Sequence, residues 1–158
     1  MVMTGARGPG QHARTLRDRE SAEHELPCLR LALDRDQAAP SIARAAVRGF
    51  SQESDFALAE SATLALLVSE LVSNAVLHSD APSASAIVLR ARLLDAETVR
   101  IEVVDAGTGF GSAPRDRVRP RAGYGLFLVD SQSTRWGIDR EGGTRVWFEL
   151  SRSVAGFG

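Results

Sequence analysis

A long helical pattern spans residues 56–78, and any fold of this chain must cover the apolar side of that helix. The apolar residues recur every three or four positions, as on one helix face: Leu64, Leu67, Val68, Leu71, Val72 and Ala75. Three polar residues, Glu70, Asn74 and His78, follow one another at successive turns beside this face. Because a carboxylate and an amide are costly at the edge of a buried face, this edge is a candidate site.

Around this helix the sequence predicts five strands and two shorter helices. The strands are predicted over residues 26–33, 85–93, 98–105, 135–139 and 144–151, and the helices over residues 36–50 and 123–133. In the third strand Val99, Ile101 and Val103 alternate with charged residues, which is typical of a strand with one buried face. We therefore expect an α+β fold, a two-layer α/β sandwich with a mostly antiparallel sheet and helices on one face.

Length and composition indicate one domain flanked by tails. We expect residues 1–25 to form a mobile polar tail, residues 26–152 the domain and residues 153–158 a C-terminal tail. Residues 106–122 are rich in glycine, proline and arginine and are predicted to form a lid-like loop. Four arginines alternate along it and are interpreted as solvated charges, in preference to a role in closing over a ligand: Arg115, Arg117, Arg119 and Arg121.

Composition argues against several classes of protein. All nineteen basic residues are arginine, so the chain lacks the lysine of P-loop enzymes, eukaryotic-type protein kinases and pyridoxal enzymes. A net charge of −1 provides no basic field for nucleic acid or an anionic membrane. The lone Cys28 and three scattered histidines indicate neither a disulfide nor a zinc site. We see no signal peptide and no apolar run of membrane-spanning length, so we expect a cytoplasmic protein.

Three glycine-containing motifs lie where strands end or helices begin. Residues 105–109 (Asp-Ala-Gly-Thr-Gly) end a strand, where the carboxylate is placed to accept a hydrogen bond from an exocyclic amine. Residues 123–126 (Gly-Tyr-Gly-Leu) open a helix, whose free N–H groups form an anion site. Residues 142–144 (Gly-Gly-Thr) bring a hydroxyl to the start of the last strand. Taken alone, the first and third motifs are better explained as ordinary turns. An ordinary loop-to-helix junction is the alternative explanation for the second.

The polar edge of the long helix has two interpretations. Glu70 suits a carboxylate that orients or deprotonates a nucleophile, and Asn74 suits an amide oxygen that holds Mg²⁺. A solvated helix edge with a capping amide explains the same residues about equally well. His78 is interpreted as a structural residue at the helix end.

Taken together and in this order, the motifs resemble the sequence boxes of the GHKL ATP-binding superfamily. These boxes are Glu-x-x-x-Asn on a helix, Asp-x-Gly-x-Gly, a lid, Gly-x-Gly-Leu and Gly-Thr, and the resemblance spans residues 26–150. It implies the Bergerat fold, an α/β sandwich that holds ATP under a mobile lid. Residues 74–78 (Asn-Ala-Val-Leu-His), the Trp136-Gly137 pair and residues 146–150 further resemble the anti-sigma factor serine kinases, in particular small actinobacterial members.

The resemblance implies a role for each matching residue. Glu70 would be the general base on the attacking hydroxyl, and Asn74 would be the Mg²⁺ ligand. Asp105 would recognise the adenine amine, with Gly107 and Gly109 shaping the pocket. Thr144 would support the adenine end, and Gly123 and Gly125 would present N–H groups to the phosphates. Their neighbours Tyr124 and Leu126 are counted among the nucleotide-binding residues. The implied cofactors are ATP and Mg²⁺.

The resemblance also implies a function. We expect a serine/threonine kinase that phosphorylates a small anti-anti-sigma partner of the STAS type, with a sigma factor and a second copy of the chain as further partners. Two alternatives stay open: a nucleotide-gated anti-sigma or adaptor module without catalysis, and a detached histidine-kinase ATPase domain. Leu29, Leu31 and the helix over residues 36–50 serve equally well as a dimer face or as core.

Overall fold

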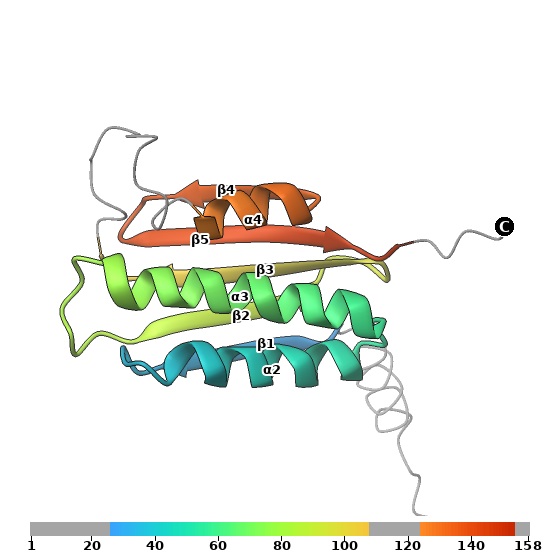
Figure 1. The fold of residues 1–158 in the computed structure, drawn as a ribbon, viewed down its shortest axis with the longest axis horizontal. Helices are drawn as coiled ribbons and strands as arrows, with labels where there is room; N and C mark the ends of the chain where they lie inside the picture. The colour runs from blue at the N-terminus through green and yellow to red at the C-terminus, as the bar shows by residue number, and fades with distance from the viewer. Residues whose placement is uncertain (1–25, 108–123, 154–158) are drawn as a thin grey trace, which may run out of the picture.

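The computed structural model describes residues 26–107 and 124–153, which form five strands and three helices (Figure 1). In chain order these are β1 (Cys28–Leu33), α2 (Ala39–Glu53), α3 (Leu58–His78), β2 (Ile87–Leu93), β3 (Thr98–Asp105), α4 (Tyr124–Gln132), β4 (Arg135–Asp139) and β5 (Thr144–Ser151). The predicted N-terminal tail, and most of the predicted lid-like loop and C-terminal tail, lie outside the described residues.

The five strands form one sheet in the order β1-β2-β3-β5-β4, and all four pairings are antiparallel. Figure 1 shows the three helices on the same side of this sheet, with α2 beside β1, α3 across the middle and α4 beside β4 and β5. This confirms the predicted α+β sandwich. The strand order also brings the end of β3 next to the start of β5 in the centre of the sheet, where Asp105 pairs with Thr144.

Alternation along the strands decides which side chains face the helices. Leu89, Val99 and Ile101 are fully buried under the helical layer, whereas Arg90 and Arg100 lie on the opposite face of the sheet. This is the pattern of a sheet that the described helices cover on one side only. The alternation of apolar and charged residues in the sequence therefore predicts correctly which side chains face the helices.

Strand β1 is an edge strand, and its apolar side belongs to the core. Leu29 pairs with Ala91 and Leu31 with Leu89, and both leucines are half-buried against the core cluster. On the described chain these residues serve as core, and dimer formation through them stays a prediction.

The predicted ends of α2 are each shifted by three residues. The carboxylate of Asp36 accepts the N–H of Ala38 at 2.8 Å, and this local turn delays the helix until Ala39, with Pro40 in its first turn. At the other end Ser51 continues the helix because its hydroxyl contacts that of Ser61 on α3 at 2.6 Å in a buried position. A short hydrogen-bonding side chain therefore extends α2 through a segment predicted as a break.

Helix α3 is the core helix of the molecule. By length and composition it is also apolar enough to cross a membrane, contrary to the expectation that the chain has no apolar run of that length. However, 56% of its 18-residue apolar window is buried in the protein, and Leu64, Leu67 and Val68 are inaccessible to solvent. Contacts with α2 and the sheet account for its apolar composition, as expected of the central helix in a layered domain.

Candidate functional site

The polar edge of α3 meets the beginning of α4. Asn74 is buried, and Glu70 is half-buried one turn earlier. A Cβ atom on Gly125 would lie 2.9 Å from Asn74 Nδ2 and 3.5 Å from Glu70 Oε2, so only glycine allows α4 to approach this closely. The structure therefore brings together Glu70, Asn74 and the N-terminal end of α4, where the helix dipole favours an anion.

A second group of predicted residues lies at the ends of β3 and β5. Asp105 is only 6% exposed, and its cross-strand neighbour Thr144 is buried beside it. The Thr144 hydroxyl donates to the carbonyl oxygen of Gly107 at 3.1 Å, which fixes the chain immediately after Asp105. Gly107 packs against the residues after α3, because a Cβ atom there would collide with Ser79 and lie 2.6 Å from Asp80 Oδ1.

Glycines in the β4–β5 turn complete this group. Gly142 and Gly143 have φ angles of +65° and +128°, and a Cβ atom on Gly143 would lie 2.5 Å from the carbonyl oxygen of Asp105. A side chain here would both strain the backbone and displace β3. The residues 142–144 motif therefore forms the predicted turn and also positions Thr144 beside Asp105.

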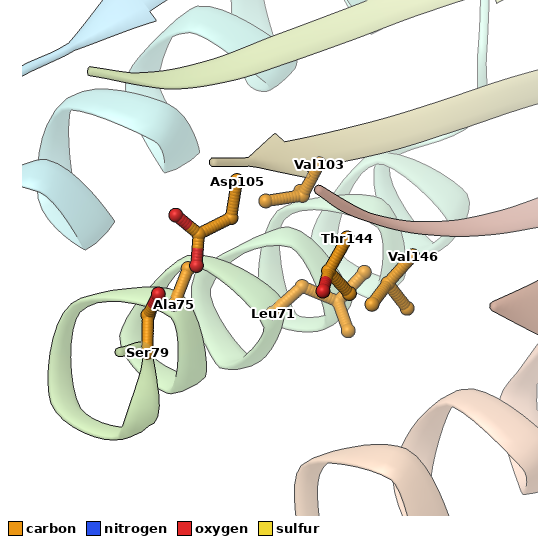
Figure 2. Close-up of a pocket in the computed structure, with 7 residues that line it drawn as sticks. All are labelled: Leu71, Ala75, Ser79, Val103, Asp105, Thr144 and Val146. Atoms are coloured by element: carbon orange, nitrogen blue, oxygen red, sulfur yellow. The ribbon is translucent and has the colours of Figure 1, made fainter. Parts of the chain in front are cut away.

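A small pocket lies between α3 and the ends of β3 and β5. Figure 2 shows Asp105 and Thr144 projecting from the ends of their strands toward α3, and the lining residues are Leu71, Ala75, Ser79, Val103, Asp105, Thr144 and Val146. Leu71 and Ala75 directly follow Glu70 and Asn74 in α3, so the polar edge is adjacent to the pocket. The enclosed cavity is about 10 Å³, room for about one water molecule, so a purine base requires lining side chains to move.

The residues at the polar edge fit a divalent cation. Asn74 Nδ2 is buried and has no hydrogen-bond partner among the described residues, so this amide is available to a ligand. An amide oxygen can coordinate Mg²⁺, and the NH₂ group can donate to a phosphate oxygen. The described residues contain no cluster of three histidine, cysteine, aspartate or glutamate side chains, so the ion would depend on Asn74 and on phosphate oxygens.

The other residues singled out in the sequence lie outside the described part of the chain or away from the pocket lining. Gly109 and Gly123 lie outside the described residues, as do the four lid arginines. Tyr124 begins α4, and Leu126 is half-buried against the core and does not line the pocket. His78 is exposed at the last position of α3.

A charged residue at the site was not predicted. Arg35, in the turn between β1 and α2, forms an ion pair with Asp105 although the two residues are 70 positions apart. In the sequence Arg35 stands between two aspartates in a polar turn and is indistinguishable from a solvated charge. No pattern in a single sequence would have identified this pair.

Comparisons with known proteins agree with this geometry. A family model described as the histidine kinase-like ATPase domain matches residues 32–150. The chain therefore belongs to the family of histidine kinase-like ATPase domains, which confirms the resemblance to GHKL proteins and implies that it binds ATP. No curated protein matches the chain.

Solved structures resemble the same region. The RsbU and RsbW domains of Rv1364c from Mycobacterium tuberculosis match with 27% identity and a TM-score of 0.64, over 80% of this chain and 33% of that chain. This chain thus spans about a third of the length of the matched chain. The SiaB–SiaC complex from Pseudomonas aeruginosa matches at 11% identity with a TM-score of 0.57, covering 89% of this chain and 98% of that one.

A blue-light activated histidine kinase, EL346 from Erythrobacter litoralis, matches at 21% identity with a TM-score of 0.55, over 79% of this chain and 43% of that chain. At these identities the last two likenesses show a shared fold.

Proposed function

We propose that this protein is an ATP-dependent serine/threonine kinase that phosphorylates a small anti-anti-sigma partner of the STAS type. The observation that carries the proposal is the placement of Glu70 and Asn74 beside the pocket that Asp105 lines, with the N-terminal end of α4 against both. The likeness to a protein with an RsbW domain and to a complex of two proteins supports a regulator that acts on a protein partner.

Each residue then has a chemical task. Asp105 accepts a hydrogen bond from the adenine amine, and the α4 end offers backbone N–H groups to phosphate oxygens. Asn74 is the residue that would hold Mg²⁺, which supplies charge neutralisation on the phosphates. This set positions the nucleotide and stabilises charge, which is most of what phosphoryl transfer requires.

Glu70 provides the base. The partner's hydroxyl oxygen attacks the γ-phosphorus, the bond from that phosphorus to the bridging oxygen breaks, and ADP leaves. The hydroxyl proton passes to the Glu70 carboxylate, which is half-buried and has no hydrogen bond to another described residue.

ATP and the proposed partner are intracellular, so we propose that the protein acts in the cytoplasm. A sigma factor and a second copy of the chain are further proposed partners.

The first experiment measures nucleotide binding. Calorimetric titration with ATP and ADP, with and without Mg²⁺, should give saturable binding in the wild type that requires Mg²⁺ for ATP. Asp105→Asn, whose amide offers only one acceptor oxygen, should show no binding. Absence of binding at millimolar nucleotide would contradict the proposal.

A second experiment tests catalysis. With a STAS-type partner, Glu70→Gln should reduce phosphate transfer by about 10²- to 10⁴-fold and leave ATP affinity nearly unchanged. Glu53→Gln, at the exposed end of α2, is the matched control and should transfer at the wild-type rate. Equal partner regulation by wild type and Glu70→Gln would indicate a nucleotide-gated binding module. Acid-labile phosphate on the partner would indicate a detached histidine-kinase domain.

A further inference from the structure

The guanidinium group of Arg35 is a buried connector at the proposed adenine end of the site. Its side chain is only 6% exposed. Nη1 donates to the carbonyl oxygen of Ala75 at 2.6 Å, and Nη2 donates to the Ser85 hydroxyl at 3.3 Å and to Oδ1 of Asp105. One side chain thus joins α3, the turn before β2 and the end of β3.

Because of this contact, the two oxygens of the Asp105 carboxylate have different hydrogen-bonding surroundings. Oδ1 accepts from Arg35 and also lies 3.4 Å from the backbone N–H of Gly107. No donor from the described residues contacts Oδ2. A carboxylate held through one oxygen by a rigid guanidinium fork cannot rotate freely, so its second oxygen has a fixed direction. Asp105 lines the pocket, so this fixed acceptor is available to a ligand there.

We infer that Arg35 is a positioning residue that gives this site its preference for a purine with an exocyclic amine at C6. The inference rests on the proposed nucleotide-binding function. A carboxylate oxygen that is held in place and only accepts hydrogen bonds pairs with the 6-amino group of adenine. It is repelled by the 6-oxo group of guanine, which is itself an acceptor. Arg35 touches no part of the nucleotide in this arrangement and acts through Asp105.

A second arginine, Arg152, also links separate segments of the chain but lies away from the site, so it serves as a structural control for Arg35. Arg152 donates to the carbonyl oxygens of Ser54 and Asp55, the latter at 3.0 Å, and stacks on the Phe56 ring at 4.3 Å. Like Arg35 it has a buried Nε without a partner among the described residues. Arg152 contacts no residue of the pocket, whereas Arg35 contacts two of its lining residues, Ala75 and Asp105.

The test compares base selectivity in matched variants of the full chain. Dissociation constants for ADP and GDP are measured by calorimetry for wild type, Arg35→Gln, Arg35→Lys, Arg152→Gln and Arg152→Lys. We expect the wild type to prefer ADP, and the ADP-over-GDP ratio to fall by about tenfold or more in Arg35→Gln, because the acceptor loses its fixed direction. Both Arg152 variants should keep the wild-type ratio even where their thermal stability falls.

The lysine variant keeps the experiment decisive if Arg35→Gln does not fold. Arg35→Lys retains a positive charge but cannot contact Ala75, Ser85 and Asp105 with a planar fork, so its ratio should also fall. Failure of wild-type chain to bind either nucleotide would contradict the proposed function itself. Wild-type binding without a preference for ADP, or an unchanged ratio in a folded Arg35 variant, would overturn the role of Arg35 and leave nucleotide binding intact.

Discussion

At the scale of single residues, the contacts of two glycines lead to opposite predictions for the same substitution. A Cβ atom on Gly49 in α2 would meet no neighbouring atom within 4 Å, so Gly49→Ala should stabilise the protein by about 0.5–1 kcal/mol through helix propensity. Gly125 lies in α4 against Asn74 and Glu70, so Gly125→Ala should destabilise it by about 1–3 kcal/mol through overpacking. Thermal unfolding monitored by circular dichroism measures both changes.

The same pair of variants also tests the site. Gly125→Ala pushes α4 away from the polar edge of α3 and should weaken ATP binding, whereas Gly49→Ala should leave ATP affinity unchanged. If Gly125→Ala were as stable as the wild type and bound ATP equally well, the close approach of α4 to Asn74 would be wrong.

At the scale of elements, the open face of the sheet carries a buried charge network. Glu102 and Glu149 are 7% and 6% exposed although none of the three described helices covers them. Arg100 explains this burial, because it bonds both carboxylates at 3.0 Å and lies over the Trp147 ring with its charge centre 4.0 Å from the ring centroid. Gly137 on β4 leaves room for that ring, since a Cβ atom there would lie 2.7 Å from it.

Breaking this network should destabilise the sheet. Glu149→Gln removes the charge that pairs with Arg100, and we expect the free energy of unfolding to fall by about 1–3 kcal/mol, as for a largely buried charged hydrogen bond. Glu141→Gln, in the exposed β4–β5 turn, is the control and should change stability by less than about 0.5 kcal/mol. Urea denaturation of the wild type, Glu149→Gln and Glu141→Gln measures their midpoints of unfolding. Equal midpoints would show that the network contributes no net stability.

The sequence predicts these elements well because their signals are local. Alternation in β3 and the three-to-four spacing in α3 identify element type within a few residues, and the motif order is enough to identify the family. Contacts between distant residues have no such signal. The pairing of Arg35 with Asp105 depends on how β1, α3 and β3 are stacked, and the burial of Glu149 depends on an arginine from a neighbouring strand. Neither follows from periodicity or composition.

At the scale of the whole molecule, the candidate site lies between the two layers. Leu71 and Ala75 contribute the helical wall of the pocket, and Asp105 and Thr144 contribute the sheet wall. The opposite end of α3 is held by other contacts, because Glu60 accepts the N–H groups of Ala57 and Ser153 at 3.1 Å and 2.7 Å. A ligand in the pocket would therefore connect the layers at the end of α3 that carries the candidate site.

Nucleotide binding should accordingly stabilise the whole domain against unfolding. Because a ligand that binds only the folded state adds RT ln(1 + [L]/Kd), ATP with Mg²⁺ at about 100 times its Kd should add about 2.7 kcal/mol. For a domain of this size that raises the unfolding midpoint by about 5–10 °C. Chelation of Mg²⁺ with EDTA should remove most of the increment, since the ion that Asn74 would hold neutralises charge on the phosphates. Scanning calorimetry of the wild type and Asp105→Asn measures this rise in the unfolding midpoint. If ATP raised the midpoint equally in both proteins, the nucleotide would bind somewhere other than the Asp105 pocket.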